Sequence, residues 1–205
     1  MRSTKYKMCR VYNMKLFNVM NLDAEVTYHK SEVAAFLYTS DFYGGLSNMS
    51  QNRPVLYNGL FWCSSEHLYH ACKFPDAPGV QEEIFNQPTP RLAKEVSRQN
   101  DALKRVDWQL VKAQAMAWCI TQRLITAENT EHVLFRIDLE LTQTRPIVEI
   151  SHRDRFWGAE PVGQTYVGSN VLGKLLTQLR DGARETTPPH GTRFFNEYYP
   201  FGIEI

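Results

Sequence analysis

The sequence, 205 residues long, has little that would mark a secreted, membrane or disordered protein. Its four cysteines are scattered, and no stretch approaches the roughly 18 consecutive apolar residues of a membrane-spanning helix. The first 30 residues lack the continuous apolar core of a secretory signal. We therefore expect reduced thiols, a cytoplasmic location and no membrane partner.

A strong excess of charge is also missing, since 23 Lys and Arg oppose 22 Asp and Glu for a net charge of +1. Hydrophobic residues make up 43% of the chain, enough to bury one sizeable core, which excludes disordered and fibrous classes. The charge is unevenly placed: residues 1–30 carry six basic and two acidic groups, 6 − 2 = +4. Such a stretch is either a solvated tail or an aid to binding a polyanion.

Two motifs are incomplete. Cys63, His67, His70 and Cys72 are all potential zinc ligands, but the order Glu-His-x-x-His matches neither zinc-protease motif, so we expect no metal. Residues 163–170 form a glycine-containing turn without the Gly-Lys-Ser/Thr of a nucleotide-binding P-loop, which disfavours a nucleoside triphosphatase. That turn could still hold a phosphate at a helix N-terminus, or simply begin a capped helix.

Local patterns predict an α+β fold that is mostly α-helical, a single compact domain with a few short strands. Asn58-Gly59 between two short apolar runs predicts a β-hairpin. Helices are predicted over 64–74, 89–98, 108–125, 131–141 and 170–181, and short strands over 35–38 and 146–150. We divide the chain into an N-terminal extension (1–30), a catalytic domain (31–182) and an irregular C-terminal segment (183–205) that packs on it.

One candidate constellation lies on the helix that begins at Ser64. Glu66, His70 and Lys73 are spaced i, i+4 and i+7, so they share a face. This face could be a solvated capping and ion-pairing surface, because a carboxylate in the first turn is stabilised by the helix dipole. It could equally direct a carboxylate and an amine into one cleft.

A second constellation follows the strand at 146–150. Asp154 lies between two arginines and before Phe156, Trp157 and Gly158. The carboxylate could belong to a surface ion pair of little energetic weight. The same residues would also suit a site for a flat base or a sugar, where aromatic faces stack and the carboxylate engages hydroxyls or water.

Taken together, these motifs resemble one known family. The pattern is Leu-Ser-Asn at 46–48, Glu-His with Lys-Phe at 66–74, Asp-Trp at 107–108, Val-Glu at 148–149 with Asp at 154 and Trp-Gly at 157–158, and Asn-x-Leu-Gly at 170–173. In combination it is similar to the NADAR, or YbiA-like, family, and the resemblance covers about residues 36–181. The sequence departs from the family pattern at Ser97, where glycine is usual, and in the loop at 159–163.

The resemblance implies a compact, mostly helical α+β enzyme that hydrolyses N-glycosidic bonds without a cofactor. It implies removal of ADP-ribose from ADP-ribosylated guanine in nucleosides or DNA, the antitoxin-like reversal of a modification made by a cognate ADP-ribosyltransferase toxin. The alternative substrates it implies are phosphoribosylamino-pyrimidine intermediates of riboflavin biosynthesis. Carried over by position, the site comprises Ser47, Asn48, Glu66, Lys73, Trp108, Asp154, Trp157, Gly158 and Asn170.

The chemistry of such a reaction assigns roles to these residues. Glu66 and Asp154 are the candidates for proton donation and for stabilising positive charge on the sugar. Burial against a tryptophan would raise the pKa of Glu66 and favour its acid form. Lys73 could trap the opened sugar as a Schiff base, or water could attack directly. We expect phosphates over the helix N-terminus at Asn170, with Arg98 as a second contact.

Two other kinds of function remain open. A reader domain would bind ADP-ribose or NAD without hydrolysing it, and would need the aromatic and phosphate contacts but neither Glu66 nor Asp154. A domain with a vestigial pocket would neither bind nor turn over. The presence of both carboxylates and Lys73 favours the enzyme.

Overall fold

The computed structural model describes residues 15–198. The basic residues Arg2, Lys5, Lys7 and Arg10 of the predicted extension lie outside the described residues. The helices are α1 (Ser65–Ala71), α2 (Pro78–Phe85), α3 (Pro90–Gln99), α4 (Trp108–Asn129), α5 (Leu134–Leu141), α6 (Val171–Arg180) and α7 (Phe195–Tyr198). The strands are β1 (Val26–His29), β2 (Ala34–Phe36), β3 (Val55–Tyr57), β4 (Leu60–Trp62), β5 (Ile147–Glu149), β6 (Glu160–Val162) and β7 (Thr165–Gly168).

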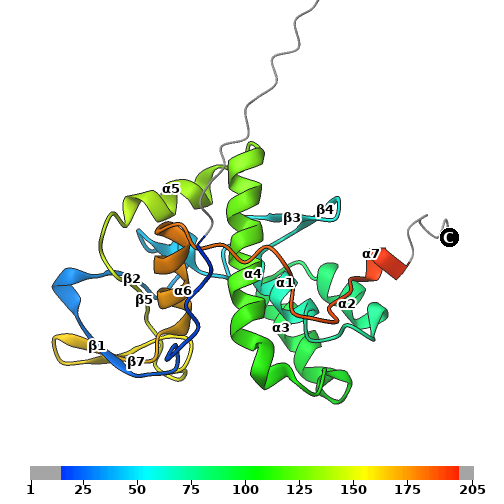
Figure 1. Ribbon diagram of the computed structural model, residues 1–205, viewed down its shortest axis with the longest axis horizontal. Helices are drawn as coiled ribbons and strands as arrows, with labels where there is room; N and C mark the ends of the chain where they lie inside the picture. Colours follow the sequence, from blue (N-terminus) through cyan, green and yellow to red (C-terminus); the bar gives the residue numbers. More distant parts are fainter. Residues whose placement is uncertain (1–14, 199–205) are drawn as a thin grey trace, which may run out of the picture.

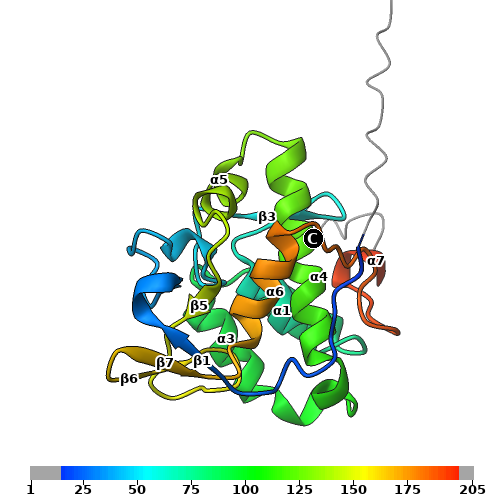
Figure 2. The same cartoon turned by 60° about the vertical axis from the view of Figure 1, so that its left-hand side comes forward.

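The long helix α4 runs through the middle of the molecule, with α1, α2 and α3 on one side and α6 with most of the strands on the other (Figure 1). Figure 2 shows α6 running beside α4. Helix α4 packs against α1, α5, α6 and β3. The predicted α+β fold, mostly helical and built as one domain, is confirmed. The middle of α4 is buried on both faces because other elements pack on either side of it. A surface helix, in contrast, buries only one apolar stripe.

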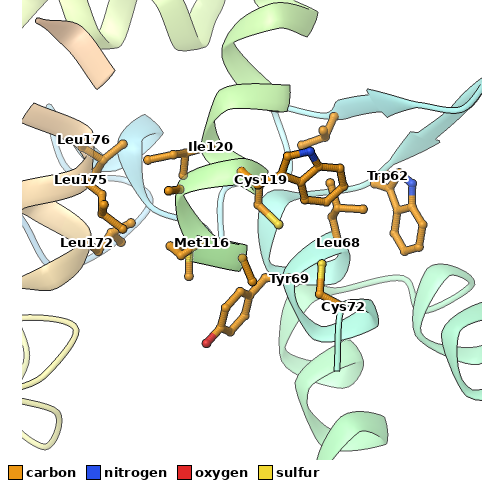
Figure 3. Close-up of a cluster of buried hydrophobic side chains, with 14 of the residues drawn as sticks. Trp62, Leu68, Tyr69, Cys72, Met116, Cys119, Ile120, Leu172, Leu175 and Leu176 are labelled. Atoms are coloured by element: carbon orange, nitrogen blue, oxygen red, sulfur yellow. The ribbon is translucent and has the colours of Figure 1, made fainter. Parts of the chain in front are cut away.

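The core follows from the apolar positions of these helices. On α6, Leu172, Leu175 and Leu176 are buried in the predicted i, i+3, i+4 pattern. They face Met116 and Ile120 of α4, and α1 covers the other side of α4 with its own buried residues (Figure 3). The result is one continuous core that fixes the position of α1 relative to α4.

The strands form three small sheets. β2 and β5 pair in parallel, β3 and β4 form the predicted hairpin, and β1, β7 and β6 form an antiparallel sheet in that order. Asn58 and Gly59 both have positive φ, 48° and 77°, as the predicted turn requires. β1 lies within the predicted N-terminal extension, yet it pairs along its whole length with β7.

The chain's last described segment is also part of the body. Phe194 is fully buried and stacks on Trp118, with ring centroids 5.6 Å apart. Gln81 donates to the Arg193 carbonyl at 2.7 Å, which ties this segment to α2. Residues 183–198 therefore contribute to the core as well as covering it.

Gly173 marks the closest approach between α6 and β5. A Cβ at this position would lie 2.1 Å from the Ile147 carbonyl oxygen, which is backbone and cannot move away. We expect Gly173→Ala to lower the free energy of unfolding by about 2 kcal/mol or more. The control is Gly79→Ala in α2, where a Cβ would meet nothing within 4 Å and should stabilise by about 0.5 kcal/mol. Urea unfolding compares the two; equal stability of both variants would contradict the close contact.

Candidate active site

A cavity of about 400 Å³ opens where α1, α3, the start of α4 and the loop after β5 meet. Six separate segments of the chain supply its walls. Its polar lining consists of Asn48, Glu66, His70, Lys73, Lys94, Gln109, Lys112, Glu149, Ser151 and Asp154, and its aromatic lining of Tyr69, Trp108 and Trp157.

The face predicted on α1 points into this cavity. Glu66, His70 and Lys73 all line it, while Leu68 and Cys72 on the other side of the helix are fully buried in the core. Ser64 caps the helix as predicted, accepting a hydrogen bond from the His67 backbone N–H at 3.4 Å. The residues are therefore aimed by an amphipathic helix whose apolar side is held by α4.

A hydrogen-bonded chain connects these three side chains. Lys73 Nζ donates to Ser97 Oγ at 3.1 Å, and Ser97 Oγ is 3.0 Å from His70 Nδ1. His70 Nε2 lies 3.0 Å from Glu66 Oε1. An ionised Glu66 requires the proton of the imidazole on Nε2, so that Nδ1 accepts from the serine hydroxyl. The chain then runs in one direction, from Lys73 through Ser97 and His70 to Glu66.

Burial changes the acid–base properties of this chain. It lowers the pKa of Lys73 to about 8, with help from Lys104 and Lys94 and against the opposing charge of Glu66. Burial also lowers the pKa of His70, which keeps the imidazole neutral at pH 7. A fraction of the Lys73 amine is therefore free to act as a nucleophile near neutral pH.

The acid form predicted for Glu66 is not what the structure favours. Burial does raise the pKa of Glu66, but contact with His70 and the charges of Lys94 and Lys73 outweigh burial and lower the pKa below its ordinary value. Glu66 is 8% exposed and ionised at neutral pH. It can accept a proton or stabilise a sugar cation, and it is a poor proton donor.

Glu149 is the group suited to donate a proton, and the predicted site did not include it. Burial raises its pKa to about 8, and the negative charges of Glu66 and Asp154 add to the shift. Its backbone is fixed because the Glu149 N–H donates to Asn170 Oδ1 at 3.1 Å. Two carboxyl groups of one cavity thus have pKa values pushed in opposite directions, the pattern that separates an acid from a base.

Asp154 lines the cavity from an exposed loop and also organises that loop. Its Oδ1 accepts hydrogen bonds from the backbone N–H groups of Phe156 and Trp157, at 3.0 and 2.9 Å. Trp157 lines the cavity and contacts Tyr69 edge to face. Gly158 follows Trp157, and a Cβ at Gly158 would be 2.6 Å from the Glu149 carbonyl oxygen. Gly158 therefore serves the close approach of this loop to β5.

The opposite wall is formed by Trp108 and by the loop that carries Asn48. Trp108 is nearly buried, and the Lys73 ammonium lies 5.5 Å from its ring centroid. Asn48 accepts from the Ser65 hydroxyl at 3.1 Å and so is fixed to the start of α1. Ser47 does not line the cavity; its hydroxyl accepts from the Met49 backbone N–H at 3.2 Å and holds the loop.

The phosphate site predicted at Asn170 is wrong. Asn170 is fully buried, and its side chain donates to the Ile147 carbonyl at 2.8 Å instead of capping α6. The backbone N–H groups of residues 170–172 donate to the carbonyls of residues 156–158. These three donors at the N-terminus of α6 are therefore engaged by carbonyls of the protein, and Asn170 serves to connect β5 with α6.

The predicted role of Arg98 as a second phosphate contact also does not match its position. It does not line the cavity, its side chain is 71% exposed, and it pairs with Glu95 at 3.0 Å. One residue along a helix turns a side chain by about 100°. That rotation places Ser97, and not Arg98, against His70 and Lys73.

Ser97 offers a direct test of the hydrogen-bonded chain. Ser97→Ala removes the acceptor for the Lys73 ammonium, so we expect the pKa of Lys73 to fall further and kcat/KM to drop about tenfold. The acidic limb of the pH–rate profile should move to lower pH. Ser50→Ala removes another buried serine hydroxyl that lies outside the chain and serves as the control. An unmoved limb in Ser97→Ala would show that the serine has only a packing role.

The described part of the chain holds no group of three or more His, Cys, Asp or Glu side chains that could bind a metal ion. His67, one of the possible ligands in the sequence, contacts Ser64 Oγ at 2.8 Å and the Gln87 carbonyl at 3.1 Å. No helix between residues 15 and 198 is both long and apolar enough to cross a membrane.

Comparison with known proteins identifies the family. Residues 27–184 match the model of the NADAR domain. The chain belongs to the NADAR domain family. It is 34% identical over 146 residues to N-glycosidase YbiA of Escherichia coli, covering 71% of this chain and 85% of that protein.

A solved structure of YbiA and one further relative are informative. The solution structure of E. coli YbiA superposes with a TM-score of 0.61 at 32% identity and covers 74% of this chain and 84% of YbiA. The riboflavin biosynthesis protein PYRR of Zea mays is 30% identical over 183 residues, which is 83% of this chain and 28% of that longer protein. The NADAR match ends close to the C-terminal end of α6 and begins inside β1, so residues 15–26 lie outside it.

Proposed function

We propose that this protein is an N-glycoside hydrolase that removes ADP-ribose from ADP-ribosylated guanine in nucleosides or nucleic acid. The observation that carries the proposal is the presence in one cavity of Glu149 with a pKa of about 8, Glu66 with a lowered pKa, and Lys73 with a pKa of about 8. A reader domain would need none of these three shifts. The names of the N-glycosidase relatives support the same reaction class.

The three groups suit a covalent route for a sugar joined through an amine nitrogen. Glu149 donates its proton to the ring oxygen as the bond from that oxygen to C1′ breaks and the nitrogen lone pair forms a C1′=N iminium. The Lys73 amine adds to C1′, passes a proton to the departing amine and becomes the new iminium. The released base carries the nitrogen and the proton away.

Water then completes the reaction. It adds to C1′ and loses a proton to Glu66, and the chain through His70 and Ser97 can return that proton to the Lys73 nitrogen. Cleavage of the bond from C1′ to Lys73 forms the sugar aldehyde, whose hydroxyl proton restores Glu149. The sum is one water consumed, one free sugar and one free amine. Direct attack of water on C1′ is the alternative route.

Charge at the cavity supports a substrate with phosphates. Lys73, Lys94 and Lys112 line it from three elements, and within residues 15–198 neither Lys94 nor Lys112 forms an ion pair with a carboxylate. A base attached to DNA must leave the stack to enter such a cavity, so single-stranded substrate should be preferred. A cognate ADP-ribosyltransferase toxin would be the functional counterpart of this activity.

The test offers two substrates in parallel and identifies the products by mass spectrometry. One is an oligonucleotide that carries ADP-ribosylated guanine, and the other is a phosphoribosylamino-pyrimidine. Free ADP-ribose with restored guanine, lost in Glu66→Gln, would support the proposal. Ribose 5-phosphate from the second substrate alone would place the protein with the riboflavin-related relatives. Stoichiometric binding of ADP-ribose without turnover would make it a reader.

A further inference from the structure

A second, larger cavity adjoins the candidate active site. It measures about 730 Å³ and lies between the N-terminal segment at residues 16–23, the first turns of α4 and Phe156. Gln109 and Lys112 line both cavities, so the two are neighbours along one face of α4. Residues 16–23 precede the region matched by the NADAR domain, so this wall is an addition to the domain.

The lining of the second cavity combines exposed apolar side chains with polar ones. Leu16 and Leu110 are 81% and 86% exposed, although both border the same hollow. Phe17 and Phe156 are half-buried and supply aromatic faces. Exposed apolar and aromatic surface within a concavity of this size is typical of a site for a flat organic group.

The N-terminal segment is held firmly enough to form a wall. Asn18 exchanges two hydrogen bonds with Gln178 of α6, at 2.6 and 3.2 Å. Lys174 donates to the carbonyls of Leu22 and Ala24, and Leu22 is buried in the core. These contacts attach the segment to α6, so its side chains face α4 at a fixed distance.

Charge around the second cavity selects among ligands. The carboxylates of Asp23 and Glu185 border it and would repel a chain of phosphodiesters, whereas they can accept hydrogen bonds from ribose hydroxyls. The one ammonium group in the lining is that of Lys112, which lies 3.8 Å from the Phe156 ring centroid at the junction with the first cavity. The polarity thus runs from cationic at the junction to apolar and acidic further away.

We propose that this second cavity binds the adenosine end of the ADP-ribosyl group, with Lys112 at the junction contacting the diphosphate. The inference rests on the proposed function and specifies its substrate class: a sugar that carries a nucleoside diphosphate, and not a simple sugar phosphate. Adenine stacks among Phe17, Leu110 and Phe156, the ribose hydroxyls face the carboxylates, and the reacting sugar lies beside Glu66 and Lys73. A ribosyl 5-phosphate would leave the cavity empty.

The test compares the binding of ADP-ribose and ribose 5-phosphate by calorimetry. Leu110→Glu places a carboxylate in the apolar lining at a site so exposed that folding should not suffer, and Phe17→Ala removes one aromatic face. We expect each to weaken ADP-ribose binding about five- to tenfold and to leave ribose 5-phosphate unchanged. Leu103→Glu, an exposed leucine outside both cavities, is the matched control.

Three outcomes would overturn the inference. They are an unchanged affinity for ADP-ribose in both variants, an equal loss for both ligands, and a larger loss for an unmodified oligonucleotide than for ADP-ribose. The last would assign the cavity to a nucleic-acid strand. Binding of the product is measured separately from turnover. If the protein cleaves neither substrate and the variants still lose ADP-ribose binding, the inference stands and the proposed hydrolysis is rejected.

Discussion

Lys73→Met is expected to abolish covalent trapping of the substrate and to reduce kcat/KM by about 10³-fold or more. In the wild-type protein, borohydride should reduce the iminium between Lys73 and C1′ to a stable secondary amine, seen as a mass increase on the peptide that contains residue 73. Methionine keeps the apolar stem that packs beside Trp108 and removes only the amine. The effect should therefore be chemical and not a loss of folding.

The pKa of Lys73 determines how the yield of trapped adduct should change with pH. The nucleophile is the neutral amine, and burial lowers the pKa of Lys73 to about 8. The yield of trapped adduct should rise as pH increases toward about 8, well below the ordinary value of 10.5, and should fall above about 8 as Glu149 loses its proton. Lys30→Met is the control, because it removes an ammonium that lines neither cavity and should leave trapping at residue 73 intact.

Two results would contradict the covalent route. Trapping that persists in Lys73→Met would transfer the role to another amine, and Lys112 would be examined next. Full turnover by the wild-type protein with no adduct at any pH would favour direct attack of water on C1′. In that case Lys73 would remain a cation near the phosphates, and Lys73→Met would raise KM more than it lowers kcat.

Much of the fold is encoded locally, and so it could be predicted from the sequence. The hairpin follows from Asn58-Gly59, and Ser64 and Thr89 cap α1 and α3, since each side chain accepts from a backbone N–H three residues later. The shared face of Glu66 and His70 follows from helical spacing alone, whereas Lys73 lies in the turn after α1, which ends at Ala71. Each of these features depends on residues within a few positions of one another.

The failures share a different cause, because each depends on contacts made across the fold. Asn170 follows the expected pattern of a helix cap, but its amide is used by β5, whose carbonyl and N–H groups lie 21 to 23 residues away in sequence. On α5, helical spacing places Leu134, Ile137 and Leu141 on one side, yet all three are exposed, and Phe135 and Leu139 are buried instead. Periodicity identifies candidate faces, and tertiary packing decides which of them is buried.

The sequence around Glu149 does contain a signal for a carboxyl group with a raised pKa. A carboxylate within the apolar run Ile147-Val148-Glu149-Ile150 must lie on a buried strand or beside a cavity, and both environments raise its pKa. What the sequence does not contain is the proximity of Glu66 and Asp154, whose charges add to the effect of burial. Sequence reasoning could therefore name the residue type for the acid but not choose among the three carboxylates.

Glu149→Gln should lower kcat by about 10²- to 10⁴-fold, because glutamine has the shape of the protonated acid but no proton to donate. In the wild-type protein the protonated form is lost as pH rises through about 8, so activity should fall on the alkaline side of that value. In Glu149→Gln the residual rate should lack this alkaline limb.

Stability separates this catalytic effect from damage to the fold. The folded protein holds the Glu149 proton up to about pH 8, whereas the unfolded chain releases it near its ordinary pKa of 4.5. Between these values the folded state binds more protons, so Glu149 makes unfolding easier as pH rises. Glu149→Gln removes this penalty, and its unfolding midpoint should exceed that of the wild type increasingly from pH 5 to pH 8. An inactive variant with that stability profile assigns Glu149 as the buried acid, whereas an active one with an unchanged alkaline limb would return the role to Asp154.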